Sequence, residues 1–79
     1  KLTKLKKLNL SGTNIKSLKG LEPLVNLEEL DVASTDLRSL KALEGMSNLK
    51  KLICFNTRLT PRGVDSFKES FPKCEVRFY

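Results

Sequence analysis

The sequence predicts a single right-handed α/β solenoid arc. It would have about four short parallel strands on its concave side, irregular turns on its convex side and a capping helix near the C-terminus. Three observations predict this fold. Apolar residues recur with a period of 22 residues along the 79-residue chain. Within each period a short stretch alternates apolar and outward residues, as a half-buried strand does. Near the C-terminus the apolar spacing becomes helical.

The period is seen in columns of matching residues, and such a fixed period is the signature of a repeat architecture. The columns are Leu5, Leu27 and Leu49; Leu8, Leu30 and Leu52; Leu10, Val32 and Cys54; Thr13, Thr35 and Thr57; and Ile15, Leu37 and Leu59. They divide one domain, residues 1–79, into repeats 5–26, 27–48 and 49–70 and a partial repeat, 71–79. In the partial repeat we expect Phe71, Cys74 and Val76 to occupy the slots of Leu49, Leu52 and Cys54.

The pattern L-x-x-L-x-L-x-x-T-x-L resembles the leucine-rich repeat family, with Thr where Asn is most common. The 22-residue length is most similar to the phosphatase-regulator-type and internalin-type repeats. The resemblance covers essentially the whole chain. It implies that parallel strands line the concave face and that a partner docks there. It indicates the fold more strongly than the function, because such repeats serve many unrelated partners.

The strands are expected at residues 8–10, 30–32 and 52–54, each pairing in parallel with the next. The Thr column follows where the chain leaves each strand. A short hydroxyl side chain there can form hydrogen bonds with loop backbone that no strand satisfies. Gly20 and Pro23 interrupt the return segment of the first repeat, which favours loose or 3₁₀-like turns.

The third repeat predicts a helix from about Pro61 to Ser70. Thr60 suits the N-cap and Pro61 the first helical position. Val64, Phe67 and Phe71 then follow at helical spacing. An atypical last repeat of this kind covers the open end of a solenoid. A final strand, residues 73–77, would place Lys73, Glu75 and Arg77 outward, and we expect the natural C-terminus at or near Tyr79.

The N-terminal end carries four leucines in core slots: Leu2, Leu5, Leu8 and Leu10. An apolar edge of this kind associates readily in water. It predicts that further repeats or a cap precede Lys1, so that the chain is the C-terminal part of a longer solenoid. Self-association through this uncapped edge is the alternative.

Composition argues against catalysis and against a metal or other cofactor. The chain has no His and only two cysteines, so it lacks both the commonest acid–base group and the ligands of a zinc site. No Ser or Thr has a partner that would activate it. No apolar run is long enough for membrane insertion. We therefore expect a non-enzymatic scaffold.

The cysteines are expected to be free. Cys54 and Cys74 would lie on adjacent strands but at different levels, with their Cα atoms about 8 Å apart. A disulfide needs a separation below about 7 Å. Two reduced thiols in the core favour a reducing compartment without proving one.

The net charge of +6 raises the question of nucleic-acid binding. Basic residues are spread over both faces and alternate with acidic ones, whereas a nucleic-acid site generally needs one contiguous basic face. Glu28 and Glu29 would lie between Lys6 and Lys7 on one side and Lys50 and Lys51 on the other. We interpret this as a ladder of weak cross-strand ion pairs.

The best candidate site is a patch of outward residues on the strands. Ile53 and Phe55 are apolar, outward by parity and two residues apart, which is typical of binding hot spots. Phe55 could instead fold over the turn at Thr57, or the helix could cover both residues. With those alternatives open, we expect a partner-binding face formed by Ile53, Phe55, Glu29, Asp31, Lys51 and Arg77.

Three functions fit this pattern. The leading one is recognition of a partner protein, of unknown identity, through the concave face. The second is architectural, in which these repeats cap or space a larger protein and touch no external partner. The third is electrostatic binding to nucleic acid or another anionic surface, which predicts a steep dependence on salt.

Overall fold

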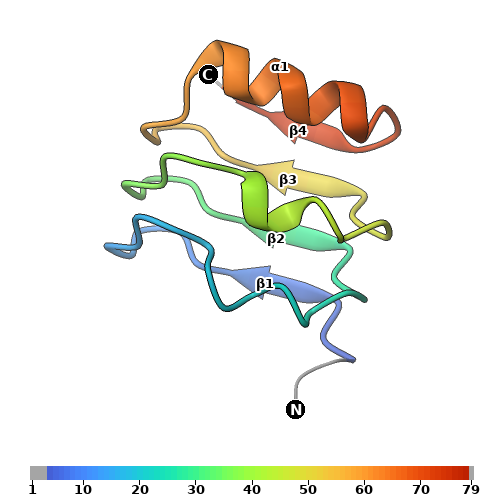
Figure 1. Cartoon of the computed structure of the whole chain (residues 1–79). Helices are drawn as coiled ribbons and strands as arrows, with labels where there is room; N and C mark the ends of the chain where they lie inside the picture. The colour runs from blue at the N-terminus through green and yellow to red at the C-terminus, as the bar shows by residue number, and fades with distance from the viewer. Residues whose placement is uncertain (1–3, 79) are drawn as a thin grey trace.

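The computed structural model describes residues 4–78 and shows a stack of strand–turn units. Strands β1 (Lys7–Asn9), β2 (Glu29–Asp31), β3 (Lys51–Ile53) and β4 (Glu75–Arg77) form one parallel sheet in the order of the chain (Figure 1). A 3₁₀ helix, η1 (Lys41–Leu43), follows β2, and α1 (Pro61–Ser70) follows β3. The predicted solenoid is therefore confirmed.

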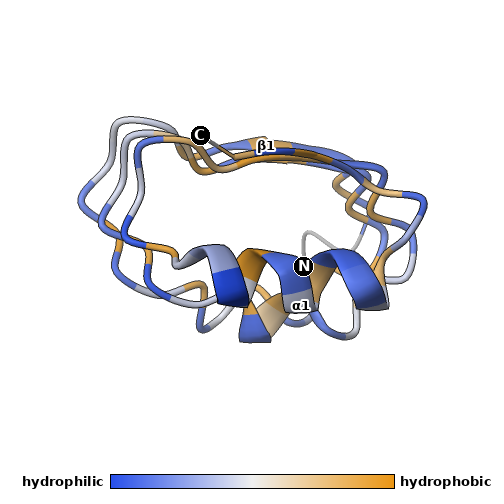
Figure 2. Ribbon diagram, turned by 90° about the horizontal axis from the view of Figure 1, so that it is seen from above, coloured by the Kyte–Doolittle hydropathy of each residue, from blue (hydrophilic) through white to orange (hydrophobic). Residues whose placement is uncertain are grey.

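The molecule has two layers with an apolar interior. Seen along the stack, the sheet forms one side, and the turns and α1 form the other (Figure 2). The repeat columns fill the space between them: Leu27, Leu30, Val32, Leu37, Leu43 and Leu52 are at most 1% exposed. Each repeat thus buries its leucines against the repeats on either side, which is what holds a solenoid together.

The Thr column forms the predicted hydrogen bonds. The hydroxyl groups of Thr13, Thr35 and Thr57 donate to the carbonyl oxygen three residues earlier, at 2.7, 2.7 and 3.0 Å. The hydroxyl groups of Thr35 and Thr57 also accept from the backbone N–H two residues later, each at 3.3 Å. Thr therefore satisfies loop backbone at the point where the sheet ladder ends.

A second column, not predicted from the sequence, fixes the turn after each strand. Gly12, Ser34 and Asn56 lie 22 residues apart and all have positive φ, at 76°, 57° and 55°. Only Gly adopts this left-handed conformation freely, and Asn tolerates it better than most residues. The Asn56 side-chain amide donates to the Ser34 hydroxyl at 3.1 Å, which ties two of these turns together. The sequence signal that could have predicted this column is the recurrence of small or turn-forming residues every 22 positions.

The return segments differ between repeats, as predicted. The first repeat has only turns, the second has η1, and the third has α1 over the predicted residues. The Thr60 hydroxyl accepts from Gly63 N–H at 3.0 Å, which is the expected N-cap. Val64 and Phe67 are buried on the inner side of α1.

The predicted alignment of the fourth strand is wrong by two residues. Val76, not Cys74, pairs with Leu52, and Glu75 rather than Lys73 pairs with Lys51. The third repeat is 24 residues long because it accommodates a ten-residue helix and the turn after it. The strand itself covers Glu75–Arg77, shorter than expected.

The two ends of the stack are less buried than its middle. At the N-terminal end Leu5, Leu8 and Leu10 are half-buried, while the corresponding residues of the second repeat are almost inaccessible. At the C-terminal end Val76 and Phe78 are also half-buried. Leu2, the first leucine of the predicted apolar edge, lies outside the described residues.

Candidate protein-binding face

The outer side of the sheet, called the strand face, presents columns of side chains at right angles to the strands. Alternation along each strand sends the even-numbered residues into the core and the odd-numbered ones outward. With the observed register the first column reads Lys7, Glu29, Lys51 and Glu75, and the second reads Asn9, Asp31, Ile53 and Arg77. The first column alternates in charge at every step, whereas the predicted register would have placed Lys73 next to Lys51.

The strand face has a shallow hollow of about 280 Å³ over β1, β2 and β3. Four of the six predicted site residues line it: Glu29, Asp31, Lys51 and Ile53. The others in its lining are Lys7, Leu8, Asn9 and Leu30. The hollow thus combines an apolar side chain at one edge with charges of both signs.

Ile53 is half-buried and points to the outer side of the sheet. The predicted alternative, that α1 covers it, does not hold, because α1 lies across the core from the sheet (Figure 2). A half-exposed isoleucine among charged neighbours is the kind of side chain that becomes fully buried when a partner binds.

The remaining two predicted residues lie beside the hollow rather than in it. Arg77 is next to Ile53 in register, and its Nε donates to Glu75 Oε2 at 2.7 Å. Phe55 follows β3, is half-buried and is already engaged with neighbouring residues. Its carbonyl accepts from Ser34 N–H at 3.1 Å, and the adjacent Ala33 is only 3% exposed although parity places it outward.

Charges on the strand side are locally paired. Lys7 lies 3.5 Å from Glu29 and Lys50 lies 3.9 Å from Glu28, so two ion pairs of the predicted cross-strand ladder are present. The hydrogen bond and charge of Arg77 and the nearby Lys51 lower the pKa of Glu75. These pairs are exposed and screened by water, so they add little to stability. They also give this side of the sheet a regular alternation of charge.

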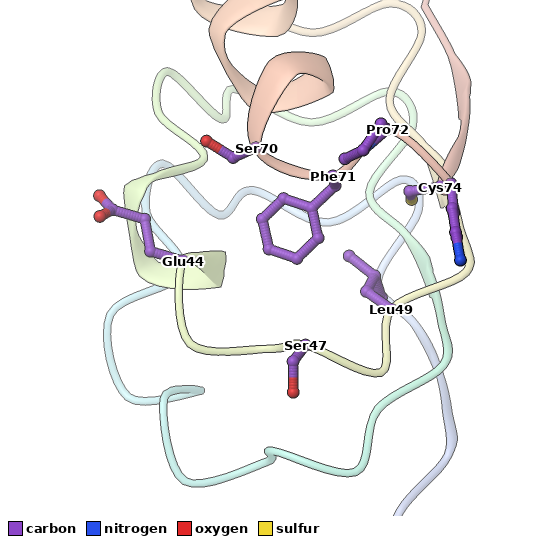
Figure 3. Close-up of a pocket in the computed structure, with 8 residues that line it drawn as sticks. Glu44, Ser47, Leu49, Ser70, Phe71, Pro72 and Cys74 are labelled. Atoms are coloured by element: carbon purple, nitrogen blue, oxygen red, sulfur yellow. The ribbon is translucent and has the colours of Figure 1, made fainter.

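A second hollow lies away from the strand face, where α1 ends and the chain leads into β4. It has a volume of about 410 Å³ between the η1–β3 connection and the C-terminal end of α1. Figure 3 shows the Phe71 ring in its middle, near Leu49 and Cys74. Phe71 also stacks on Phe67, with ring centroids 4.4 Å apart. Phe71 was predicted to be a core residue, and this hollow was not anticipated from the sequence.

Both cysteines are free thiols, as predicted. In the observed register Cys74 is level with Lys50, four residues from the level of Cys54, so they are farther apart than the sequence predicts. Burial raises the pKa of the Cys54 thiol to about 11 and also raises the pKa of Cys74. A thiol with a raised pKa is a poor nucleophile, so neither cysteine resembles a catalytic one.

Residues 4–78 contain no cluster of three or more His, Cys, Asp or Glu side chains arranged to bind a metal ion. Within the same residues, no helix has the length and apolar character needed to span a membrane.

Comparison with known families decides the classification. The family model described as "Leucine Rich repeats (2 copies)" matches residues 3–45, more than half of the chain. The chain belongs to the leucine-rich repeat family. A comparison of this leucine-rich repeat chain with the curated proteins finds no match.

A solved structure supports the same classification. A leucine-rich repeat protein of Leptospira interrogans is 28% identical and superposes with a TM-score of 0.87 over 98% of the chain. The chain spans 20% of that protein's length. Leucine-rich repeat domains generally mediate protein–protein interaction and are typically non-enzymatic scaffolds.

Proposed function

We propose that the chain is a protein-recognition module whose strand face binds a partner protein. The observation that carries this proposal is the hollow over β1, β2 and β3, where Ile53 stands next to Lys51 and across from Asp31. Protein interfaces generally combine apolar contact residues with a polar and charged surround, and this hollow has both. Four parallel strands hold the backbone of these residues at fixed positions. Little conformational entropy of this chain would therefore be lost when a partner binds.

The proposed contacts have different roles. Ile53 would be the apolar anchor, with Phe55 beside it at the end of β3. Glu29, Asp31, Lys51 and Arg77 would set the orientation of the partner by their alternating charges. A partner surface of complementary pattern would present a carboxylate toward Lys51 and a basic group toward Asp31.

The test compares two charge reversals of the same kind on opposite sides of the molecule. A partner would be captured with a photo-crosslinking side chain at Ile53, then purified and titrated against variants by calorimetry. Lys51→Glu should weaken binding about tenfold or more, because it reverses one charge in the lining of the hollow. Lys68→Glu, on exposed α1, should leave the affinity unchanged. Equal affinity of both variants would contradict the proposal.

Two truncations separate binding from folding. Ile53→Ala should reduce the affinity by about tenfold while changing the thermal midpoint little, since Ile53 is only half-buried. If Phe55→Ala lowers the thermal midpoint by several degrees, then Phe55 is a packing residue and the anchor is Ile53 alone. Loss of stability in both variants, with unchanged affinity, would exclude the strand face as the site.

A further inference from the structure

The two edge strands of the sheet are complementary to each other. These edges are a different surface from the strand face. β1 and β4 are the outermost strands of the described sheet (Figure 1). Each edge leaves apolar core residues half-buried: Leu8 and Leu10 at one, Val76 and Phe78 at the other. The corresponding residues inside the stack, such as Leu30 and Leu52, are 1% and 0% exposed. Each end therefore has apolar surface that one more strand would cover.

Backbone hydrogen bonds repeat from strand to strand in a regular series. Leu10 N–H donates to Asp31 O at 2.7 Å, Val32 N–H to Ile53 O at 2.8 Å and Cys54 N–H to Arg77 O at 2.9 Å. The next donor in this series is Phe78 N–H, directly after β4. The next acceptor, by register, is the carbonyl of Asn9 in a second copy.

A second series runs in the opposite direction. Glu29 N–H donates to Lys6 O, Lys51 N–H to Glu28 O and Glu75 N–H to Lys50 O, at 3.0, 3.1 and 2.8 Å. Its next member joins Lys7 N–H of a second copy to the Cys74 carbonyl. The C=O and N–H of a trans peptide point in opposite directions. Because Lys6 O and Arg77 O face inward to their neighbouring strands, Lys7 N–H and Phe78 N–H face the outer edges.

Charge and packing agree with the same register. The column Lys7, Glu29, Lys51 and Glu75 would continue with Lys7 of the second copy, so the alternation of sign is unbroken. Leu8 would lie on Val76 and Leu10 on Phe78. α1 lies across the core from the sheet and does not cover the edge of β4 (Figure 2).

We propose that two copies of this chain join head to tail, with β1 of one pairing in parallel with the outer edge of β4 of the other. An antiparallel joint between two β4 strands would also pair Glu75 with Arg77, but it would leave Leu8 and Leu10 uncovered. A head-to-tail joint uses two different edges, so it does not close on itself and can add further copies. The strand face stays open along the whole stack.

The test uses proline to block one edge at a time. Lys7→Pro and Phe78→Pro each remove an N–H that faces an outer edge, and both leave the donors between β1, β2, β3 and β4 in place. The matched controls, Lys7→Ala and Phe78→Ala, shorten the same side chains but keep the N–H groups. Mass is measured by sedimentation over a concentration series, and circular dichroism checks that each variant is folded.

For the unmodified chain the average mass should rise steadily with concentration, without stopping at a dimer. Each proline variant alone should remain at the mass of one chain, 8.9 kDa for the unmodified sequence. An equimolar mixture of the two proline variants should form a dimer and nothing larger, because one unblocked β1 edge and one unblocked β4 edge remain. The alanine controls should still associate more strongly than the proline variants.

Several results would overturn this joint. Self-association of the Lys7→Pro chain alone would indicate a β4–β4 joint, and self-association of the Phe78→Pro chain alone would indicate a β1–β1 joint. A single-chain mass for the unmodified protein at every concentration would exclude any joint. If a proline variant does not fold, hydrogen exchange of the unmodified chain decides: dilution should speed exchange at Lys7 and Phe78 and leave Val32 and Cys54 unaffected. Equal responses at all four amides would contradict the proposal.

Discussion

Glu75 of β4 lies in register with Lys51 of β3, two residues from the position that a strict 22-residue repeat gives. This places a carboxylate rather than the Lys73 ammonium beside Lys51. The first column of the strand face therefore alternates in sign from β1 to β4. The helical third repeat thus determines the electrostatic pattern of the surface on the other side of the molecule.

Thr35 tests the role of the Thr column. Thr35→Val keeps the shape but removes a hydroxyl group that donates to Val32 O and accepts from Leu37 N–H in a site only 6% exposed. We expect a loss of about 1–3 kcal/mol in the free energy of unfolding, measured by urea denaturation, because buried backbone groups lose their partners. The exposed Thr13→Val is the control and should cost less, since water can replace its hydrogen bond. Equal losses would show that burial of the hydroxyl is unimportant.

Gly12 tests the column of positive φ. Gly12→Ala should destabilise the protein by about 1–2 kcal/mol, because an L side chain is strained at φ 76°. Gly45→Ala is a matched control, since neither position has an atom within 4 Å of the added Cβ and Gly45 has no positive φ. Thermal unfolding of the control should match or slightly exceed that of the unmodified chain. A similar loss in both variants would contradict the conformational explanation.

Leu30 and Leu8 occupy the same slot in adjacent repeats, yet differ in burial. Leu30→Ala should cost roughly 2–5 kcal/mol, as expected for a fully buried leucine. Leu8→Ala should cost clearly less, because its side chain is already half-exposed at the end of the stack. Guanidinium denaturation of both variants provides the comparison. If Leu8→Ala costs as much as Leu30→Ala, the edge of β1 is covered in solution.

Cys54 predicts a loss of stability at alkaline pH. Its pKa is about 11 in the folded chain against an ordinary value of 9.0, because burial disfavours the thiolate. Its contribution is therefore fully present below pH 9, and is lost as the pH rises through 11. The loss from this group should reach at most roughly 2–3 kcal/mol. Urea denaturation at pH 8 to 11 should show this decline, and Cys54→Ala should reduce it. An unchanged pH profile in the variant would assign the decline to other groups.

The sequence predicted the repeated part of the fold closely, because the relevant signals are local. Thr60 and Pro61 define the start of α1, and Val64 and Phe67 define its buried side. The first three strands each begin one residue before the predicted ranges. The ends of a strand depend on its hydrogen bonds to neighbouring strands, which the apolar pattern of one strand does not contain.

Errors arose where the repeat length changes. Phe71, Cys74 and Val76 have the spacing of a repeat start, but only the three-dimensional path of α1 shows that two more residues precede β4. The candidate site depended on the same distinction. Parity within one strand placed Ile53 and Lys51 correctly on the outer side. The position of Arg77 beside Ile53 depends on the register of β4, which the repeat length did not predict. Phe55 is half-buried because of packing against its neighbours, which the alternation of side chains along a strand does not predict.

The hydrogen bonds between repeats have a consequence for how the molecule opens. Within residues 4–78, backbone hydrogen bonds between repeats connect each repeat to its immediate neighbour, as in Asp36 N–H to Ile15 O and Arg58 N–H to Leu37 O. Unfolding one terminal repeat therefore breaks a single junction and leaves the others intact. Amide protection should form a gradient, highest at the junction of β2 and β3 and lower toward each end, so that the molecule frays from its ends inward.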